Sequence, residues 1–278
     1  MYGNCTTCKD FKIKMNVMDS NEQTTWAQWK TTKVSRDFKS GDKKEINIVG
    51  KDDEHGSVGR AVDIFNDLLC TTYRRHLFNL KNQYRHYRKL RETLNDTEGF
   101  THVDFSENYN AKMSKEIQSM HFGASLPQIS LHTGYYTTGQ TNKIQSFCRV
   151  SDSLRHDPSA IWAYLVPILT DMKEKHMAIE YILFYSDGPT AQYSQKINFY
   201  LFSTLIFDLG FLGGSWNFHE AGHGKGNPDG IGGSIKRSAD AKVGYWAEII
   251  DASSFVKELN NNTIKVYEIK ESEMQSRH

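Results

Sequence analysis

The segment Ile182-Leu-Phe-Tyr-Ser-Asp187-Gly-Pro-Thr190 is an apolar run that stops at a single acid. The run has the length and composition of a buried strand, and the Gly-Pro pair after it marks a turn. Open α/β sheets place their ligand-binding groups at the carboxyl ends of such strands. Asp187 is therefore the first candidate for a metal-binding acid.

On either side of this strand the sequence predicts further short strands and amphipathic helices. The five expected strands cover residues 100–105, 128–136, 143–150, 180–185 and 215–219. Turn residues between the second and third strands predict an antiparallel hairpin. Helices are expected over 157–175, where an Asp-Pro pair favours a helix start, over 191–209, and after the glycine-rich segment that follows the fifth strand.

This is the ribonuclease-H-like order, an α/β fold with a mixed five-stranded sheet flanked by helices. In that architecture the first and fourth strands lie side by side at the sheet centre, so acids on them converge. Asp104 on the first strand is the expected partner of Asp187, because an unpaired carboxylate on an apolar strand is costly. The competing interpretation is that Asp104 caps a strand end and Asp187 belongs to an Asp-Gly turn.

Two neighbouring carboxylates raise each other's pKa unless a cation lies between them, and Mg²⁺ or Mn²⁺ suits oxygen ligands. The third acid is expected after the fifth strand, in the glycine-rich segment 219–233. Asp229 is the first choice, because its Pro and Gly neighbours indicate a turn that enters a helix, and Glu220 is the rival. His223 and Lys225 are expected to orient water or hold a phosphate oxygen. Two such ions would support phosphodiester chemistry.

The glycine-rich segment has two other possible interpretations. It is not a P-loop, because Lys225 is followed by glycine rather than Ser or Thr. His219 and His223 have the spacing of a helical zinc site, which favours a zinc-dependent hydrolase, but the glycines around them argue against a helix.

A basic segment over residues 74–91 carries Lys, Arg and His with no acid. The plain interpretation is a solvated helix face; the alternative is contact with the DNA backbone. Tyr84, His86 and Tyr87 lie among the cations and could stack on a nucleic acid. The nucleic-acid-binding candidates are Arg74, Arg75, Lys81, Arg85, Arg88, Lys89, Lys236 and Arg237.

Cys5 and Cys8 form a C-x2-C pair, which is half of a structural zinc site. The sequence contains no second pair with ligand spacing, so distant groups or an upstream segment would have to complete such a site.

Length, net charge and composition limit the class of protein further. With 278 residues and a net charge of +1, the chain can build a large core, and its overall charge names no partner. It has neither a membrane-length apolar run nor a signal-peptide pattern, which predicts an intracellular protein that is not secreted. The expected organisation is a small N-terminal segment (1–57), a basic helical region (58–98), the catalytic core (99–250) and a C-terminal extension (251–278).

Several blocks resemble a family of transposable-element-derived proteins of arthropods and other animals. The blocks are VDFSENY, EIQSMHFG, QISLHTG, SDGPTAQY, WNFHEAGHGKGNPDGIGG and KRSAD, and they extend from about Asp104 to Asp240. The resemblance implies a DDE/D-type transposase-like core, with Asp104 and Asp187 at the first two acidic positions. It leaves the third position open between Glu220 and Asp229. The N-terminal region resembles the end of a longer upstream portion in such proteins.

The leading hypothesis is a divalent-metal-dependent nuclease or polynucleotidyl transferase that acts on DNA in the nucleus, with a homo-oligomer among its expected states. The alternative is a domesticated, catalytically silent DNA-binding or interaction protein that retains the fold.

Overall fold

The computed structural model describes residue 12 and residues 20–37, 43–115, 126–220, 223, 226–259 and 263–275. The predicted site residues Cys5, Cys8 and Lys225 lie outside the described residues, as does the block at 116–123. The chain divides into two compact units, Met1–Asn79 and Leu80–His278.

The first unit contains a long hairpin that the sequence did not predict. Strand β1 (Gln23–Asp37) pairs antiparallel with β2 (Lys43–Ser57) along their whole length. Helix α1 (Val58–Leu68) follows directly, and the Ser57 side chain caps it by accepting a hydrogen bond from the Arg60 amide. A π-helical turn, Leu69–Tyr73, leads into α2 (Arg74–Glu92), within which the two units divide. The hairpin strands are polar and mostly exposed, so they carry no strong apolar alternation.

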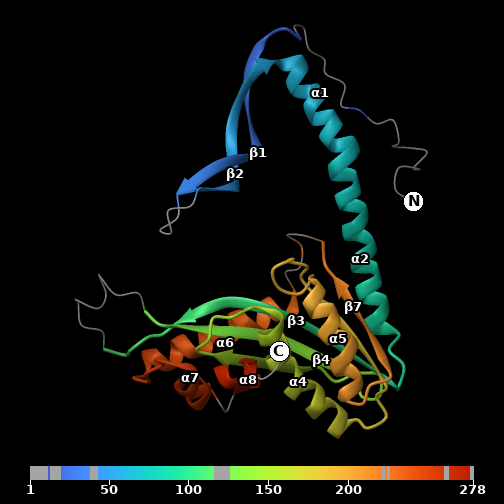
Figure 1. The fold of residues 1–278 in the computed structure, drawn as a ribbon, viewed down its shortest axis with the longest axis vertical. Helices are drawn as coiled ribbons and strands as arrows, with labels where there is room; N and C mark the ends of the chain where they lie inside the picture. Colours follow the sequence, from blue (N-terminus) through green and yellow to red (C-terminus); the bar gives the residue numbers. More distant parts are fainter. Residues whose placement is uncertain are drawn as a thin grey trace. The chain divides into compact units, whose positions relative to one another are not determined.

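The second unit is built on a six-stranded mixed sheet (Figure 1). Its strand order is β7-β6-β3-β4-β5-β8. The strands are β3 (Glu98–Asn110), β4 (Gln128–Thr138), β5 (Gln145–Ser151), β6 (Tyr181–Ser186), β7 (Gly213–Phe218) and β8 (Lys265–Glu268).

The predicted count of five strands is wrong, because β8 adds a sixth. It pairs in parallel with β5 at the edge of the sheet. This strand has four residues and one buried side chain, Val266, which is too short a pattern to indicate a strand. The other five strands lie where the sequence placed them, with boundaries that move by a few residues.

The predicted strand pairing is confirmed at two places. β4 and β5 form the antiparallel hairpin, and β3 lies beside β6 in parallel. β3 runs further than expected and changes register against β4 between Ser106 and Tyr109. Such irregularities re-aim side chains and are common next to functional sites.

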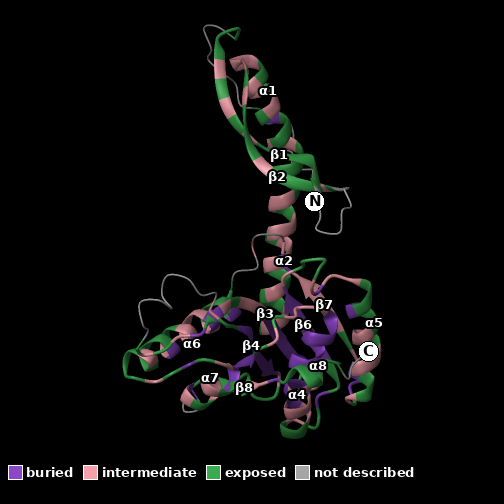
Figure 2. Cartoon of the chain, turned by 60° about the vertical axis from the view of Figure 1, so that its left-hand side comes forward, coloured by how far each residue is buried: buried purple, intermediate pink, exposed green. Residues whose placement is uncertain are grey.

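Helices cover both faces of the sheet, whose strands form the buried layer (Figure 2). On the first face, named here the α4 face, lie α4 (Pro158–Lys175), α5 (Lys196–Asp208) and α8 (Glu271–Gln275). On the second, the α6 face, lie α6 (Asn227–Gly244), α7 (Ala252–Leu259) and the end of α2. α4 starts as predicted, since Asp157 accepts a hydrogen bond from the Ala160 amide.

Within the described part of the chain, every helix is too short or too polar to span a lipid bilayer.

Candidate functional site

Strand register brings the first two predicted acids together. In the parallel ladder of β3 and β6, His102 pairs with Tyr185. Two residues further along the same direction, Asp104 on β3 and Asp187 just beyond β6 occupy neighbouring positions. The two residues are more than eighty positions apart in sequence, and parallel pairing alone makes them neighbours.

The start of α6 is fastened to the same place. Thr133 on β4 is the cross-strand partner of Asp104. Its Oγ1 lies 3.1 Å from the carbonyl oxygen of Pro228 and 3.3 Å from that of Asp104. Asp229 follows Pro228 in the first turn of α6, and its Oδ2 accepts a hydrogen bond of 2.9 Å from the Gly226 amide. Three acids from three separate elements therefore surround one end of the sheet.

The electrostatics of the acids agree with this arrangement. The pKa of Asp104 is raised to about 7, first by burial, then by the charge of Asp187 and then by that of Asp229. The pKa of Asp187 is raised as well, by burial and then by the charge of Asp229. Neighbouring negative charge thus opposes ionisation of Asp104 and Asp187, which a shared cation would relieve.

The donor set fits a hard divalent cation. Oδ1 of Asp187 is buried without a hydrogen-bond partner among the described residues, and an orphaned carboxylate oxygen is a natural metal ligand. Asp104 Oδ1 accepts a hydrogen bond from the Phe105 amide, which fixes its position. No three His, Cys, Asp or Glu side chains in the described residues are already arranged to hold a metal ion. Coulombic coupling reaches further than a coordination bond, so the acids are neighbours whose side chains are not in liganding geometry.

The other residues predicted in the glycine-rich segment have different surroundings. Glu220 is half-buried just beyond β7, and its backbone carbonyl accepts a hydrogen bond of 3.0 Å from the His223 amide. The His223 carbonyl in turn accepts a bond of 3.0 Å from the Tyr84 hydroxyl on α2. His219 is buried beside the rings of His102 and Tyr185, which encloses one of the two histidines of the zinc interpretation.

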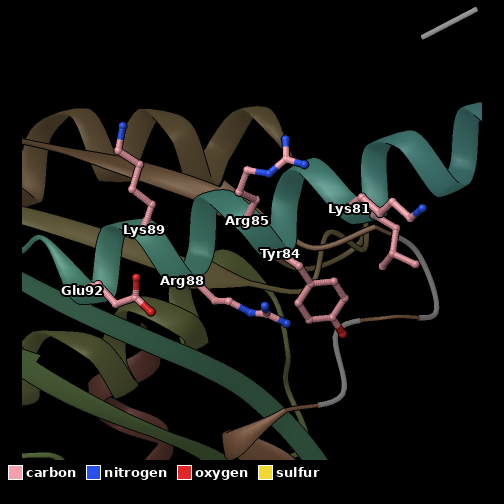
Figure 3. Close-up of a pocket in the computed structure, with 7 residues that line it drawn as sticks. Lys81, Tyr84, Arg85, Arg88, Lys89 and Glu92 are labelled. Carbon is pink, nitrogen blue, oxygen red and sulfur yellow. The ribbon is translucent and has the colours of Figure 1, made fainter. Parts of the chain in front are cut away.

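The outer side of α2 presents the predicted cations. Lys81, Arg85, Arg88 and Lys89 are all exposed, and their spacing places them on one side of the helix. We name these four residues the basic ridge. They line a hollow of about 670 Å³ together with Leu80, Tyr84 and Glu92 (Figure 3). The Tyr84 hydroxyl connects this hollow to the segment that leads to Asp229.

Tyr87 and His86, two of the side chains predicted to contact a nucleic acid, contact residues of the sheet. The Tyr87 hydroxyl lies 2.6 Å from the Tyr135 hydroxyl and 3.2 Å from Nδ1 of His102. His86 Nδ1 lies 2.9 Å from the Tyr185 hydroxyl. These side chains fasten α2 to the sheet, because they lie on the side of the helix opposite the basic ridge. Tyr84 is half-buried and remains at the edge of the hollow.

The remaining predicted cations are not part of the basic ridge as defined. Arg74 and Arg75 belong to the first unit. On α6, Lys236 lies 3.6 Å from the Glu107 carboxylate, while Arg237 is exposed.

The sequence interpretation missed two residues at the acids. One is Thr133, whose signal is a polar residue opposite Asp104 in the strand register. The other is the fully buried Tyr193, whose hydroxyl lies 3.1 Å from Nε2 of His132. The pKa of Tyr193 is raised by burial and then by the charges of Asp104 and Asp187.

A known protein family matches most of the second unit. Residues 83–278 match the model of a family described as a domain of unknown function, DUF8701. The chain belongs to the DUF8701 family. The match includes Asp104, Asp187, Asp229 and all of the basic ridge except Lys81.

Comparisons with curated proteins and with solved structures give weaker similarity or none. No curated protein matches it. Among solved structures, it is similar to the Mos1 transposase paired-end complex with left transposon end, at 12% sequence identity and a TM-score of 0.36. The similarity covers 67% of this chain and 54% of the transposase chain, so the DUF8701 chain spans about half the length of that protein. A likeness this distant carries no functional conclusion.

Proposed function

We propose that this protein is a transposase-like, divalent-metal-dependent enzyme that cleaves or transfers DNA strands on a ribonuclease-H-like core. The observation that carries the proposal is the gathering of Asp104, Asp187 and Asp229 from three elements at one end of the sheet. The order β5-β4-β3-β6-β7, with β3 and β6 parallel at its centre, supports the fold assignment.

In this proposal Asp104, Asp187 and Asp229 would turn their carboxylates toward a shared Mg²⁺ or Mn²⁺. A bound divalent ion supplies an activated water or 3′-hydroxyl and stabilises the leaving oxygen in phosphodiester chemistry. Asp229 is favoured over Glu220 as the third acid, because the charge of Asp229 raises the pKa of both other acids. Phe105 and Gly226 hold two of the carboxylates in position through their backbone amides.

The basic ridge supplies the proposed DNA contact. No acidic side chain among the described residues forms an ion pair with its four cations, so they are available to phosphates. Contacts of this kind position the backbone and read little sequence. The bond from Tyr84 to His223 places this surface next to the segment that leads to Asp229.

The test is a DNA cleavage and strand-transfer assay with Mg²⁺ or Mn²⁺. Asp187→Asn is expected to lower the rate by about 10³-fold, since the ion contributes several kcal/mol to such transition states. Asp229→Asn is expected to lose activity, whereas the matched change Glu220→Gln keeps most of it. Equal rates in wild type and Asp187→Asn would reject the catalytic proposal and favour the silent DNA-binding alternative.

A further inference from the structure

A second cavity lies on the α4 face, away from the acids. Its volume is about 220 Å³, which is smaller than typical cofactor pockets and suits a small group. Residues of β4, β5, β8 and α4 line it, among them Tyr136, Gln145, Arg149, Asp171, Lys265 and Tyr267. Arg149 pairs across the sheet with His132, and His132 with Phe105, so Arg149 points to the face opposite Asp104.

Arg149 is a buried cation whose Nε has no acceptor among the described residues. Its side chain is only 8% exposed, and its Nε is buried with no hydrogen-bond partner among the described residues. The guanidinium carbon lies 4.3 Å from the centre of the Tyr267 ring, which holds the guanidinium but accepts no conventional hydrogen bond. An unpaired buried charge is costly, so this arrangement calls for an anion.

The carboxylate on the cavity wall is already in use. Asp171 Oδ2 accepts hydrogen bonds of 2.6 Å from Lys175 Nζ and 3.1 Å from the Tyr136 hydroxyl. The charge of Asp171 acts on Arg149, followed by that of Glu273, which does not line the cavity. The pKa of Lys265 is lowered by the neighbouring Lys175 ammonium group, whose positive charge opposes protonation of Lys265. Positive charge is therefore in excess around the cavity.

We propose that this cavity binds a phosphate group through Arg149, Lys265 and Gln145. A guanidinium is a planar fork of donors that matches a phosphate edge, and an ammonium adds a point charge. Gln145 Oε1 lies 2.8 Å from the Tyr136 hydroxyl oxygen, and the Gln145 amide NH₂ is the third donor. The phosphate could be free, as inorganic phosphate or a small monoester, or could be the 5′-phosphate of a DNA strand. The binding does not depend on the proposed catalytic function.

The test is calorimetric titration of the full chain with inorganic phosphate at constant ionic strength, together with thermal unfolding. Arg149→Met removes the charge and keeps much of the apolar stem. It is expected to weaken phosphate binding by about tenfold or more, since bonds to charged groups are among the strong ones. Lys257→Met removes an exposed cation on α7 and is expected to change binding by less than about twofold. Equal binding in wild type and Arg149→Met, or no binding by the wild type at 10 mM phosphate, would overturn the proposal.

Gln145→Glu provides a second variant that does not remove a packed side chain. It adds a carboxylate to the cavity that Arg149 also lines, so without phosphate it should raise the melting temperature, and it should abolish the phosphate effect. A lower melting temperature with phosphate binding intact would contradict the proposal. Competition with short DNA strands identifies the source: a strand with a 5′-phosphate that displaces phosphate better than its unphosphorylated twin points to a DNA end, and equal weak competition points to a small phosphate.

Discussion

The two faces of the six-stranded sheet hold partly or fully buried charges of opposite sign. On the α6 face, Asp104 and Asp187 are half-buried carboxylates whose pKa values are raised first by burial, and then by Asp187 and Asp229 for Asp104 and by Asp229 for Asp187. On the α4 face, Arg149 is a buried guanidinium whose Nε has no acceptor among the described residues. Neither arrangement is favourable for folding by itself, because both hold charge away from bulk water with incomplete pairing.

The difference between the faces lies in how the charges are held. The acids come from β3, the end of β6 and the start of α6, so their meeting depends on parallel register and on the docking of α6 through Thr133. Arg149 depends only on the alternation of β5 and on the Tyr267 ring of the neighbouring strand. The α6 face therefore gathers a multi-element site for a cation, and the α4 face a compact one for an anion.

The largest stability effect is expected at Asp104. Its folded-state pKa of about 7 exceeds the ordinary 3.8, so the cost of ionising it appears as pH rises from 3.8 to 7 and is complete above 7. Asp104→Asn should leave stability nearly unchanged near pH 4 and raise it by on the order of 3 kcal/mol at pH 8. Urea unfolding at both pH values measures this. A variant less stable than wild type at pH 8 would break the account of the α6 face.

The basic ridge tests whether the α6 face serves DNA. Arg85→Gln with Arg88→Gln removes two phosphate contacts, which should weaken DNA binding about 10²-fold at 0.1 M salt and lower the salt slope by about two. A matched pair, Lys242→Gln with Lys257→Gln, removes two exposed cations from α6 and α7. Fluorescence anisotropy over a salt series compares them. Equal losses of DNA affinity in both pairs would mean that the basic ridge contributes no more to binding than other exposed cations.

Substitutions at two glycines of α6 test how this helix packs on the sheet without changing its charge. A Cβ on Gly232 would collide with Ser106 Oγ on β3, whereas a Cβ on Gly230 meets nothing within 4 Å. Gly232→Ala should therefore cost about 2 kcal/mol and weaken the site by displacing Asp229, while Gly230→Ala should be neutral or slightly stabilising. Denaturant unfolding of the two variants measures this difference in stability. If both behave alike, α6 does not pack on β3 as described.

A smaller effect is expected on the inner side of α2. Tyr87→Phe removes the hydroxyl that lies against Tyr135 and His102, at a cost of about 1 kcal/mol. Tyr181→Phe changes an exposed tyrosine at the start of β6 and should have no measurable effect. Thermal unfolding of both variants gives the comparison, and DNA binding by Tyr87→Phe should stay close to wild type. A loss of binding without a loss of stability would place Tyr87 at the DNA rather than in the fold.

The predictable part of the fold is the part with strong local patterns. The apolar run before Asp187 and the Asp157–Pro158 helix start predicted β6 and α4 with small boundary errors. Adjacent strand positions for Asp104 and Asp187 followed from the order of elements alone. β8 and the β1–β2 hairpin were missed, because one is four residues long and the other is polar on both faces.

The site was less predictable than the fold. The cations of α2 were visible as a run, but only the helix phase shows that Tyr87 faces inward while Arg88 faces outward. Arg149 was not singled out, because an arginine between Cys148 and Val150 is compatible with an exposed position on an edge strand. Its burial depends on β8 and α4, and those contacts cannot be derived from β5 alone.

The central claim is that Asp104, Asp187 and Asp229 share one divalent cation. The most direct test is calorimetric titration of the full chain with Mn²⁺ at pH 7, repeated in buffers of different ionisation enthalpy. The account predicts saturable binding with proton release, because the pKa of Asp104 is about 7 before the cation arrives. It also predicts at least a tenfold loss of affinity in Asp187→Asn and none in Arg149→Met. Mn²⁺ binding that is equal in wild type and Asp187→Asn, or absent from the wild type, would contradict it.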